Sequence, residues 1–211
     1  MIWDSNLAYI VGLIATDGNL SKDGRHLDFT SKDKDLIETF ILLLSLSNKI
    51  DIKKGTYDPT KTYYRVQFGS VKFYRFLKEI GLEPNKSKTL GALKIPDNYF
   101  VDFLRGSLDG DGYTYSFWDK IFPNSFRLYC VFLSASEKHI FWIRDQIKRL
   151  FLLEGKTRFV GKSIYELKFA KANSINLLKK IYYKKGLPCL ERKRFKIEQA
   201  LSIISKQADV L

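Results

Sequence analysis

Two short stretches of the sequence decide the fold, Ile10-Val-Gly-Leu-Ile-Ala-Thr-Asp-Gly18 and Leu104-Arg-Gly-Ser-Leu-Asp-Gly-Asp-Gly112. Each is a run of apolar and small residues that fits one helix and ends in Asp-Gly. Small residues recur every four positions in both stretches, and this spacing places them on one face of a helix. They are Gly12, Thr16, Gly106 and Gly110. Faces of this kind let two helices pack with their backbones nearly in contact, so we expect the two helices to cross at these residues.

The similarity between the two halves extends beyond these stretches. Residues 61–68 resemble 162–169, and Phe29-Thr-Ser31 resembles Phe132-Leu-Ser134. Matches in the same order, with length changes between them, indicate a duplicated unit. The offset between the copies grows by nine residues after the first helix, and we place the extra residues in a loop around 115–126.

Each copy has the pattern helix, strands, helix, hairpin, helix. In the first copy we expect helices at 6–16 and 71–80 and strands at 25–30, 50–56 and 63–68. We expect Gly18 to end the first helix in a left-handed conformation. Ser31 and Asp33 offer capping groups for the helix that follows them. The predicted units are a repeat at 1–81, a linker at 82–98, and a repeat with a basic C-terminal helix at 99–211.

The charge of the chain indicates a polyanionic partner. Lys and Arg number 36 against 23 Asp and Glu, which gives a net charge of +13. No apolar run approaches the ~20 residues that a membrane-spanning helix needs, so we expect nucleic acid and no membrane. Cys130 and Cys189 form no closely spaced pair, and the start of the chain does not resemble a secretory signal. We therefore expect an intracellular, reducing compartment, either cytoplasm or an organelle.

Asp17 and Asp111 are the candidate metal ligands. A helix dipole is negative at its C-terminal end, so an Asp there is unfavourable, and two such acids on crossing helices repel each other. A divalent cation between them relieves both effects, and oxygen ligands suit Mg²⁺. An Asp-Gly turn is also a common structural feature; its occurrence at the ends of two matching helices favours the metal.

The two quoted stretches resemble the signature helices of single-chain LAGLIDADG homing endonucleases, and the repeat order extends the resemblance over nearly the whole chain. It implies an α+β fold of two pseudo-twofold αββαββα repeats, with two saddle-forming antiparallel sheets that enter the DNA major groove. In the family the acid before the final Gly binds the divalent metal, which corresponds to Asp17 and Asp111. The sixth motif position, Ala15 in one copy and Asp109 in the other, is expected to face the core or interface.

The resemblance further implies a site-specific double-strand endonuclease. It would act as a monomer on a long, pseudo-palindromic or asymmetric target and leave short 3′ overhangs. Mg²⁺ is the expected cofactor; Mn²⁺ is expected to substitute for it, and Ca²⁺ to support binding without cleavage. The alternatives are an RNA maturase that assists intron splicing and a non-cutting DNA-binding regulator on the same fold.

Basic residues complete the candidate site. Lys86 resembles the family's active-site lysine, and its counterpart is Lys193 or Arg192, since the alignment slides by one residue there. Residues on the outward faces of strands are candidates for base or phosphate contacts. The DNA-binding candidates are Arg25, Lys53, Arg65, Gln67, Arg127, Arg158, Lys168 and Arg192.

Overall fold

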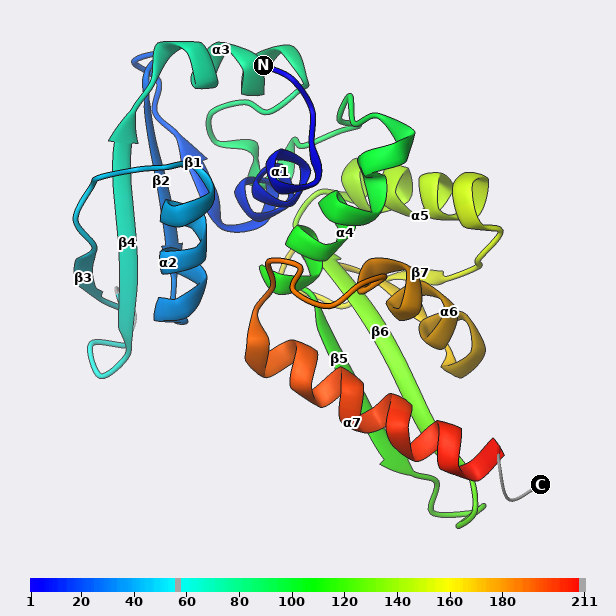
Figure 1. The fold of residues 1–211 in the computed structure, drawn as a ribbon. Helices are drawn as coiled ribbons and strands as arrows, with labels where there is room; N and C mark the ends of the chain where they lie inside the picture. The colour runs from blue at the N-terminus through cyan, green and yellow to red at the C-terminus, as the bar shows by residue number, and fades with distance from the viewer. Residues whose placement is uncertain (56–57, 209–211) are drawn as a thin grey trace.

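A computed structural model describes residues 1–55 and 58–208 and has an α+β fold built from two copies of one unit (Figure 1). The first copy contains α1 (Ser5–Asp17), β1 (Gly18–Leu20), β2 (His26–Ser31), α2 (Lys34–Leu43), β3 (Asp51–Lys54), β4 (Thr62–Gly69) and α3 (Val71–Glu79). The second contains α4 (Phe100–Asp109), β5 (Tyr113–Trp118), β6 (Phe126–Ser134), α5 (Glu137–Phe151), β7 (Lys156–Phe159), β8 (Tyr165–Phe169), α6 (Lys171–Ile181) and α7 (Glu191–Ala208).

Each copy forms one antiparallel four-stranded sheet, with strand orders β1-β2-β4-β3 and β5-β6-β8-β7. The registers of the two sheets are equivalent. Asp28 lies opposite Gln67 in the first sheet, and Val131 lies opposite Lys168 in the second. These pairs differ by the offsets at which the sequence repeats, so the predicted duplication is confirmed.

One face of each sheet is covered by helices and the other is not. Helices α2 and α3 pack on the first sheet, and α5, α6 and α7 pack on the second. The strand residues on these inner faces are buried and apolar, for example Phe29, Val66 and Phe169. Buried apolar residues on the inner face, alternating along each strand with more exposed residues on the outer face, are usual for antiparallel sheets that cover a core on one side. The helix-free outer faces are the surfaces on which the DNA-binding candidates of the strands lie.

The two copies meet through α1 and α4, which cross beside each other near the centre of Figure 1. A Cβ on Gly12 would overlap the carbonyl oxygen of Phe103, and one on Gly106 would overlap that of Tyr9. A Cβ on Gly110 would overlap the hydroxyl of Thr16. The predicted contact through these four small residues is confirmed, because no larger side chain fits between the helices.

Two local predictions need correction. Gly18 is extended (φ −85°, ψ 152°) and continues directly into β1, so it does not form a left-handed cap. Glycine is needed there because a Cβ would lie 2.7 Å from the Cα of Ile14. The loop predicted around 115–126 is only partly right: residues 119–125 do connect the two strands, but β5 extends to Trp118 and lengthens the hairpin with β6.

Residues 82–98 are packed against the protein. They contain two short 3-10 turns, η1 (Lys86–Lys88) and η2 (Asp97–Tyr99), and the side chains of Leu90 and Leu93 are buried. The Ser136 hydroxyl donates to the Leu90 carbonyl at 2.5 Å, and Nδ1 of His139 donates to the Gly91 carbonyl at 2.8 Å. The segment that follows the first copy is thus fastened to the second copy.

Other boundaries agree closely with the sequence. The basic C-terminal helix is present as α7, and the expected strand at 50–56 is present as β3 over its central part. Thr56, the predicted end of that strand, and residues 209–211 of the second unit lie outside the described residues. Among the described residues, no helix is both long enough and apolar enough to cross a bilayer.

Candidate metal and nucleic-acid site

Two aspartates come together where α1 and α4 end. Asp17 is the last residue of α1, and Asp111 follows α4 by two residues. The backbone just before Asp111 lies close to Asp17, since a Cβ on Gly110 would be 2.9 Å from Oδ2 of Asp17. Both carboxylates line an open hollow of about 500 Å³. The hollow is formed by both copies, with Thr30, Asp33 and Tyr63 from the first and Arg192 and Lys193 from the second.

The two carboxylates disfavour each other's ionisation. Burial raises the pKa of Asp17 to about 7, with a further rise from the nearby charge of Asp111. Burial of its carboxyl group among neighbouring atoms also raises the pKa of Asp111, although the residue as a whole is exposed at the surface. Lys193 and Lys86 act in the opposite direction on both acids. The site therefore favours an additional positive charge.

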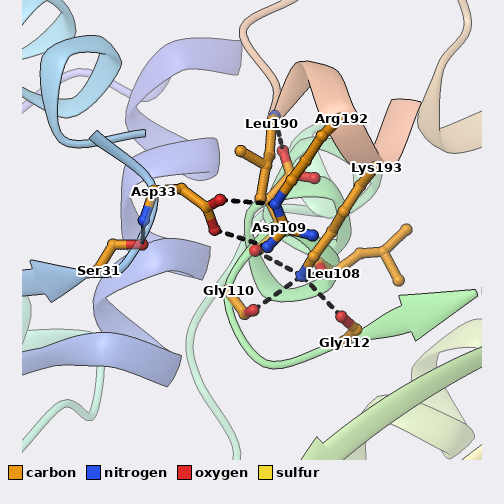
Figure 2. A network of polar contacts seen from close by, with 9 residues as sticks. All are labelled: Ser31, Asp33, Leu108, Asp109, Gly110, Gly112, Leu190, Arg192 and Lys193. Atoms are coloured by element: carbon orange, nitrogen blue, oxygen red, sulfur yellow. Dashed lines mark hydrogen bonds and ion pairs between the residues drawn. The ribbon is translucent and has the colours of Figure 1, made fainter. Parts of the chain in front are cut away.

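Two lysines reach equivalent positions beside the acids. The amino group of Lys86 is buried and donates to the carbonyl of Gly18. That of Lys193 donates to the carbonyl of Gly112, the counterpart of Gly18, at 2.7 Å (Figure 2). Burial lowers the pKa of each lysine to about 8. The geometry thus identifies Lys193, and not Arg192, as the counterpart of Lys86.

Lys193 also determines where α4 ends. Its amino group donates to the carbonyls of Leu108, Asp109 and Gly110 at 2.8, 2.7 and 2.9 Å. A positive charge on these carbonyls satisfies the free acceptors at the C-terminus of the helix. Asp111 was expected at the end of the helix itself. It lies beyond it, because the chain turns around this amino group after Asp109.

The sixth motif position is part of the interface, as expected. Ala15 is buried, and Asp109 is buried in a network beneath the hollow. Its Oδ2 accepts from the Tyr9 hydroxyl and from the backbone N–H of Leu190, both at 2.8 Å. Leu190 directly precedes α7, so Asp109 helps to fix the helix that carries Lys193.

Arg192 is held by an ion pair. Its Nε and Nη2 contact the two carboxylate oxygens of Asp33 at 2.6 Å each (Figure 2). Asp33 stands at the N-cap position of α2, but its side chain makes no capping bond. The expectation that Asp33 caps this helix is therefore wrong, because the bidentate contact with a guanidinium uses both of its oxygens. This pair joins the copies across the hollow.

The remaining DNA-binding candidates differ in their surroundings. Lys53 and Gln67 are exposed on the outer face of the first sheet, and Arg25 is exposed just before β2. Three arginines are paired with acids on their own sheets: Arg65 with Asp51, Arg127 with Asp119, and Arg158 with Glu166. Lys168 lies over the ring of Tyr129.

Sequence reasoning missed a group of aromatic side chains on the outer face of the second sheet. Tyr113, Tyr115 and Phe117 alternate along β5, and Tyr129 of β6 lies opposite Tyr115. The alternation over 113–117 was a strand signal. It was overlooked because most of this segment was assigned to a loop.

The donor set at the hollow fits a divalent cation. The two carboxylates offer hard oxygen ligands, and Mg²⁺ is usually held by one or two carboxylates together with water and substrate phosphates. Within residues 1–55 and 58–208, no three His, Cys, Asp or Glu side chains gather into a complete metal cage. A metal here would therefore need phosphate or water as further ligands.

Comparison with known proteins places the fold. Residues 4–81 match the family described as LAGLIDADG-like domain. Mesophilic variants of the homing endonuclease I-DmoI align with 92% of this chain and 97% of theirs, at 16% identity and a TM-score of 0.59. I-DmoI in complex with DNA and Ca aligns over the same shares at 18% identity and a TM-score of 0.56. No curated protein matches the sequence.

A second protein shares the fold to the same degree. Full-length DUF199/WhiA from Thermatoga maritima covers 96% of this chain at 17% identity and a TM-score of 0.58. The present chain spans 62% of that protein. At these identities the likeness establishes the fold, while the activity has to be argued from the site.

Proposed function

We propose that the chain is a divalent-metal-dependent, site-specific double-strand DNA endonuclease, because residues 4–81 match the family described as LAGLIDADG-like domain and the two copies together share the fold of I-DmoI. It acts as a monomer, because one chain supplies both halves of the site. The observation that carries the proposal is the pairing of Asp17 and Asp111 at equivalent ends of two crossing helices, in a protein of net charge +13.

Mg²⁺ bound by these carboxylates would supply a Lewis acid for the phosphoryl oxygen and lower the pKa of a water molecule. The residues of the chain provide the setting for this chemistry. Asp17 and Asp111 would each supply a carboxylate ligand to a divalent cation, and the glycine contacts between α1 and α4 fix the spacing of the two acids. One such site serves each strand, so the pair of copies cuts both strands.

Lys86 and Lys193 hold positive charge next to the scissile phosphate. A fixed cation there stabilises the negative charge that develops on the phosphoryl oxygens. The amino group of Lys193 contacts four backbone carbonyls. Lys193 therefore acts on the phosphate through the electrostatic field of its charge, and it keeps Asp111 in place. Lys86 has a single such contact, to the Gly18 carbonyl, so fewer contacts have to break for its buried amino group to turn toward a bound phosphate.

The outer faces of the two sheets form the DNA-binding surface. They lack covering helices, flank the acid pair, and carry the exposed Lys53 and Gln67 together with the paired arginines. A phosphate competes with Asp51 or Glu166 for these guanidinium groups when DNA binds. Base edges in the major groove then specify the sequence.

Cleavage of plasmids that carry a random insert library tests the proposal. With Mg²⁺ or Mn²⁺ we expect linear products from a subset of inserts, and with Ca²⁺ we expect binding without cleavage. Asp17→Asn and Asp111→Asn should each reduce double-strand cleavage about 100-fold or more and leave DNA affinity nearly unchanged. Glu79→Gln, which neutralises an exposed acid at the end of α3, is the matched control and should cut normally.

A non-cutting DNA-binding protein is the second candidate. It is favoured by one observation, the saturation of Lys193 by backbone carbonyls, which is also what a purely structural role requires. Specific binding with no cleavage in Mg²⁺ or Mn²⁺ would establish it. Tighter binding to a structured intron RNA than to any duplex DNA would instead support an RNA maturase.

A further inference from the structure

The outer face of the second sheet carries four closely packed aromatic side chains, which we call the aromatic ladder: Tyr113, Tyr115, Phe117 and Tyr129. The rings of Tyr115 and Tyr129 stack at 4.8 Å between centroids, with 15° between their planes. Tyr113 and Phe117 continue the row at 6.0 and 6.2 Å from Tyr115. Tyr115 is 36% exposed and Phe117 44%, so the ladder forms an apolar surface open to solvent.

The first sheet has no such group of aromatic side chains among its described residues, and the one row that both sheets share, which contains Tyr113 of the ladder, differs in chemistry. Strand pairing places one row of residues across each outer face at corresponding positions. The row of the first sheet is Asn19, Asp28 and Gln67. The row of the second sheet is Tyr113, Val131 and Lys168. A row of three hydrogen-bonding side chains in one copy is therefore matched in the other by an aromatic ring, an aliphatic side chain and a lysine, whose amino group lies over the ring of Tyr129.

This difference has a consequence for a duplex that lies across both sheets. A base edge that faces the first sheet finds amide and carboxylate partners. A base edge pressed against the ring faces of the ladder loses water and gains no hydrogen bond from them, although Arg127 and Lys168 lie beside the rings; this loss is unfavourable for its exposed donors and acceptors. The apolar group on the major-groove edges of the four base pairs is the C5 methyl of thymine.

We propose that the aromatic ladder recognises thymine methyl groups in one half of the target, whereas the first sheet reads the other half through hydrogen bonds. The inference rests on the proposed function, because it requires the outer faces to lie against duplex DNA. It assigns Tyr115 and Phe117 as specificity-determining residues and makes the target asymmetric, with a thymine-rich half facing β5.

The packing of the ladder disfavours binding of unpaired bases between its rings. The rings already contact one another, and a base cannot enter between Tyr115 and Tyr129 without separating them. Val131, in the same row as Tyr113, is fully buried. The hydroxyl of Tyr113 is engaged with Glu166 at 3.1 Å. The ladder is thus a preformed surface and not a set of separate stacking platforms.

The test uses the whole chain with Ca²⁺ and a random double-stranded DNA library to select a preferred duplex. Thymines of the selected site are then replaced by uracil, which removes only the methyl group, in one half at a time. We expect each methyl that contacts the ladder to contribute about fourfold to the affinity, and uracil in the other half to leave the affinity unchanged. Gln67→Ala identifies that other half, because it alters base preference there.

Protein variants tie the effect to the ladder. Phe117→Ala should weaken binding to the thymine site and abolish most of the difference between thymine and uracil. Phe195→Ala is the matched control, since Phe195 is also an exposed phenylalanine (61%, against 44% for Phe117) but lies on α7, which packs on the inner face; the uracil effect should persist in this variant. Circular dichroism checks that both variants fold, and the wild-type uracil result decides the question if one does not.

Three results would overturn the inference. If replacing thymine by uracil changes the affinity in neither half, or equally in both, the ladder does not recognise methyl groups. The proposed endonuclease function is unaffected by that result. Stronger binding to single-stranded oligonucleotides than to the selected duplex, lost in Phe117→Ala, makes the ladder a site for unpaired bases. A library from which no duplex is enriched defeats the proposed function and this inference together.

Discussion

Gly12 of α1 and Gly106 of α4 lie in direct backbone contact. A Cβ on Gly12 would be 2.9 Å from the Cα of Gly106, and one on Gly106 would be 3.0 Å from the Cα of Gly12. This contact sets the distance between the two copies and, through the helix ends, the distance between Asp17 and Asp111.

Gly106→Ala should therefore destabilise the whole protein. The added methyl meets backbone atoms that cannot rotate away, and overpacking of this kind typically costs about 1–3 kcal/mol. Urea unfolding followed by circular dichroism measures the change. Gly91→Ala is the control, because a Cβ there meets nothing within 4 Å. Equal stabilities of the two variants would contradict the described contact.

Asp17 should make the stability of the metal-free protein depend on pH. Its pKa is raised to about 7 in the folded state, so the folded protein holds a proton that the unfolded chain releases near pH 4. The contribution of Asp17 to the free energy of unfolding is therefore most favourable below about pH 4, and it is lost as the pH rises through 7.

Asp17→Asn accordingly should stabilise the protein at pH 8 in the presence of EDTA, on the order of 1–2 kcal/mol once the open hollow's screening is allowed for. The gain should shrink toward zero at pH 4. Thermal unfolding at the two pH values measures it, with Glu79→Gln as the exposed reference. A gain that is independent of pH would speak against an ionisation-linked cause.

The ion pair between Asp33 and Arg192 should couple the two copies modestly. Both partners retain some solvent contact, with 16% and 42% of their side chains exposed, and the geometry is bidentate. A double-mutant cycle with Asp33→Asn and Arg192→Gln should give a coupling of about 0.5–1 kcal/mol that falls with added salt. The exposed pair Lys34–Glu38 serves as a comparison and should couple less strongly.

DNA affinity should fall steeply with salt concentration. Each phosphate that a basic side chain neutralises releases condensed counterions, and log K falls with log[salt] by about 0.9 per contact. Fluorescence anisotropy between 50 and 300 mM KCl measures the slope. Lys53→Gln should reduce it by about one, since Lys53 is an exposed cation on the first outer face. A slope near zero would remove the electrostatic basis of the proposed interface.

The helical part of the fold and its centre were accessible from the sequence. The four-residue spacing of Gly12, Thr16, Gly106 and Gly110 is a local pattern with one packing solution, and the repeat made the pairing of α1 with α4 evident. Asp17 and Asp111 followed from the same pattern, because they occupy the same place in each copy.

Features set by contacts between distant segments were not accessible in this way. The partner of Asp33 is Arg192, far away along the chain, and nothing near Asp33 distinguishes an ion pair from a cap. The choice between Arg192 and Lys193 needed the position of Gly112 in space. The aromatic ladder was missed for a different reason: β5 is longer than β1, so the repeat gave no template for its outer half.

Among the described residues, the copies are joined at the crossing of Gly12 with Gly106, by the bond from Tyr9 to Asp109, and by the ion pair of Asp33 with Arg192. The segment between the copies is bonded to the second copy through Ser136 and the carbonyl of Leu90. These contacts hold the two sheets in one arrangement relative to each other. If the outer faces bind DNA as proposed, one base pair inserted at the middle of a bound site moves its two halves ~3.4 Å apart, so only one half should keep its contacts with the protein.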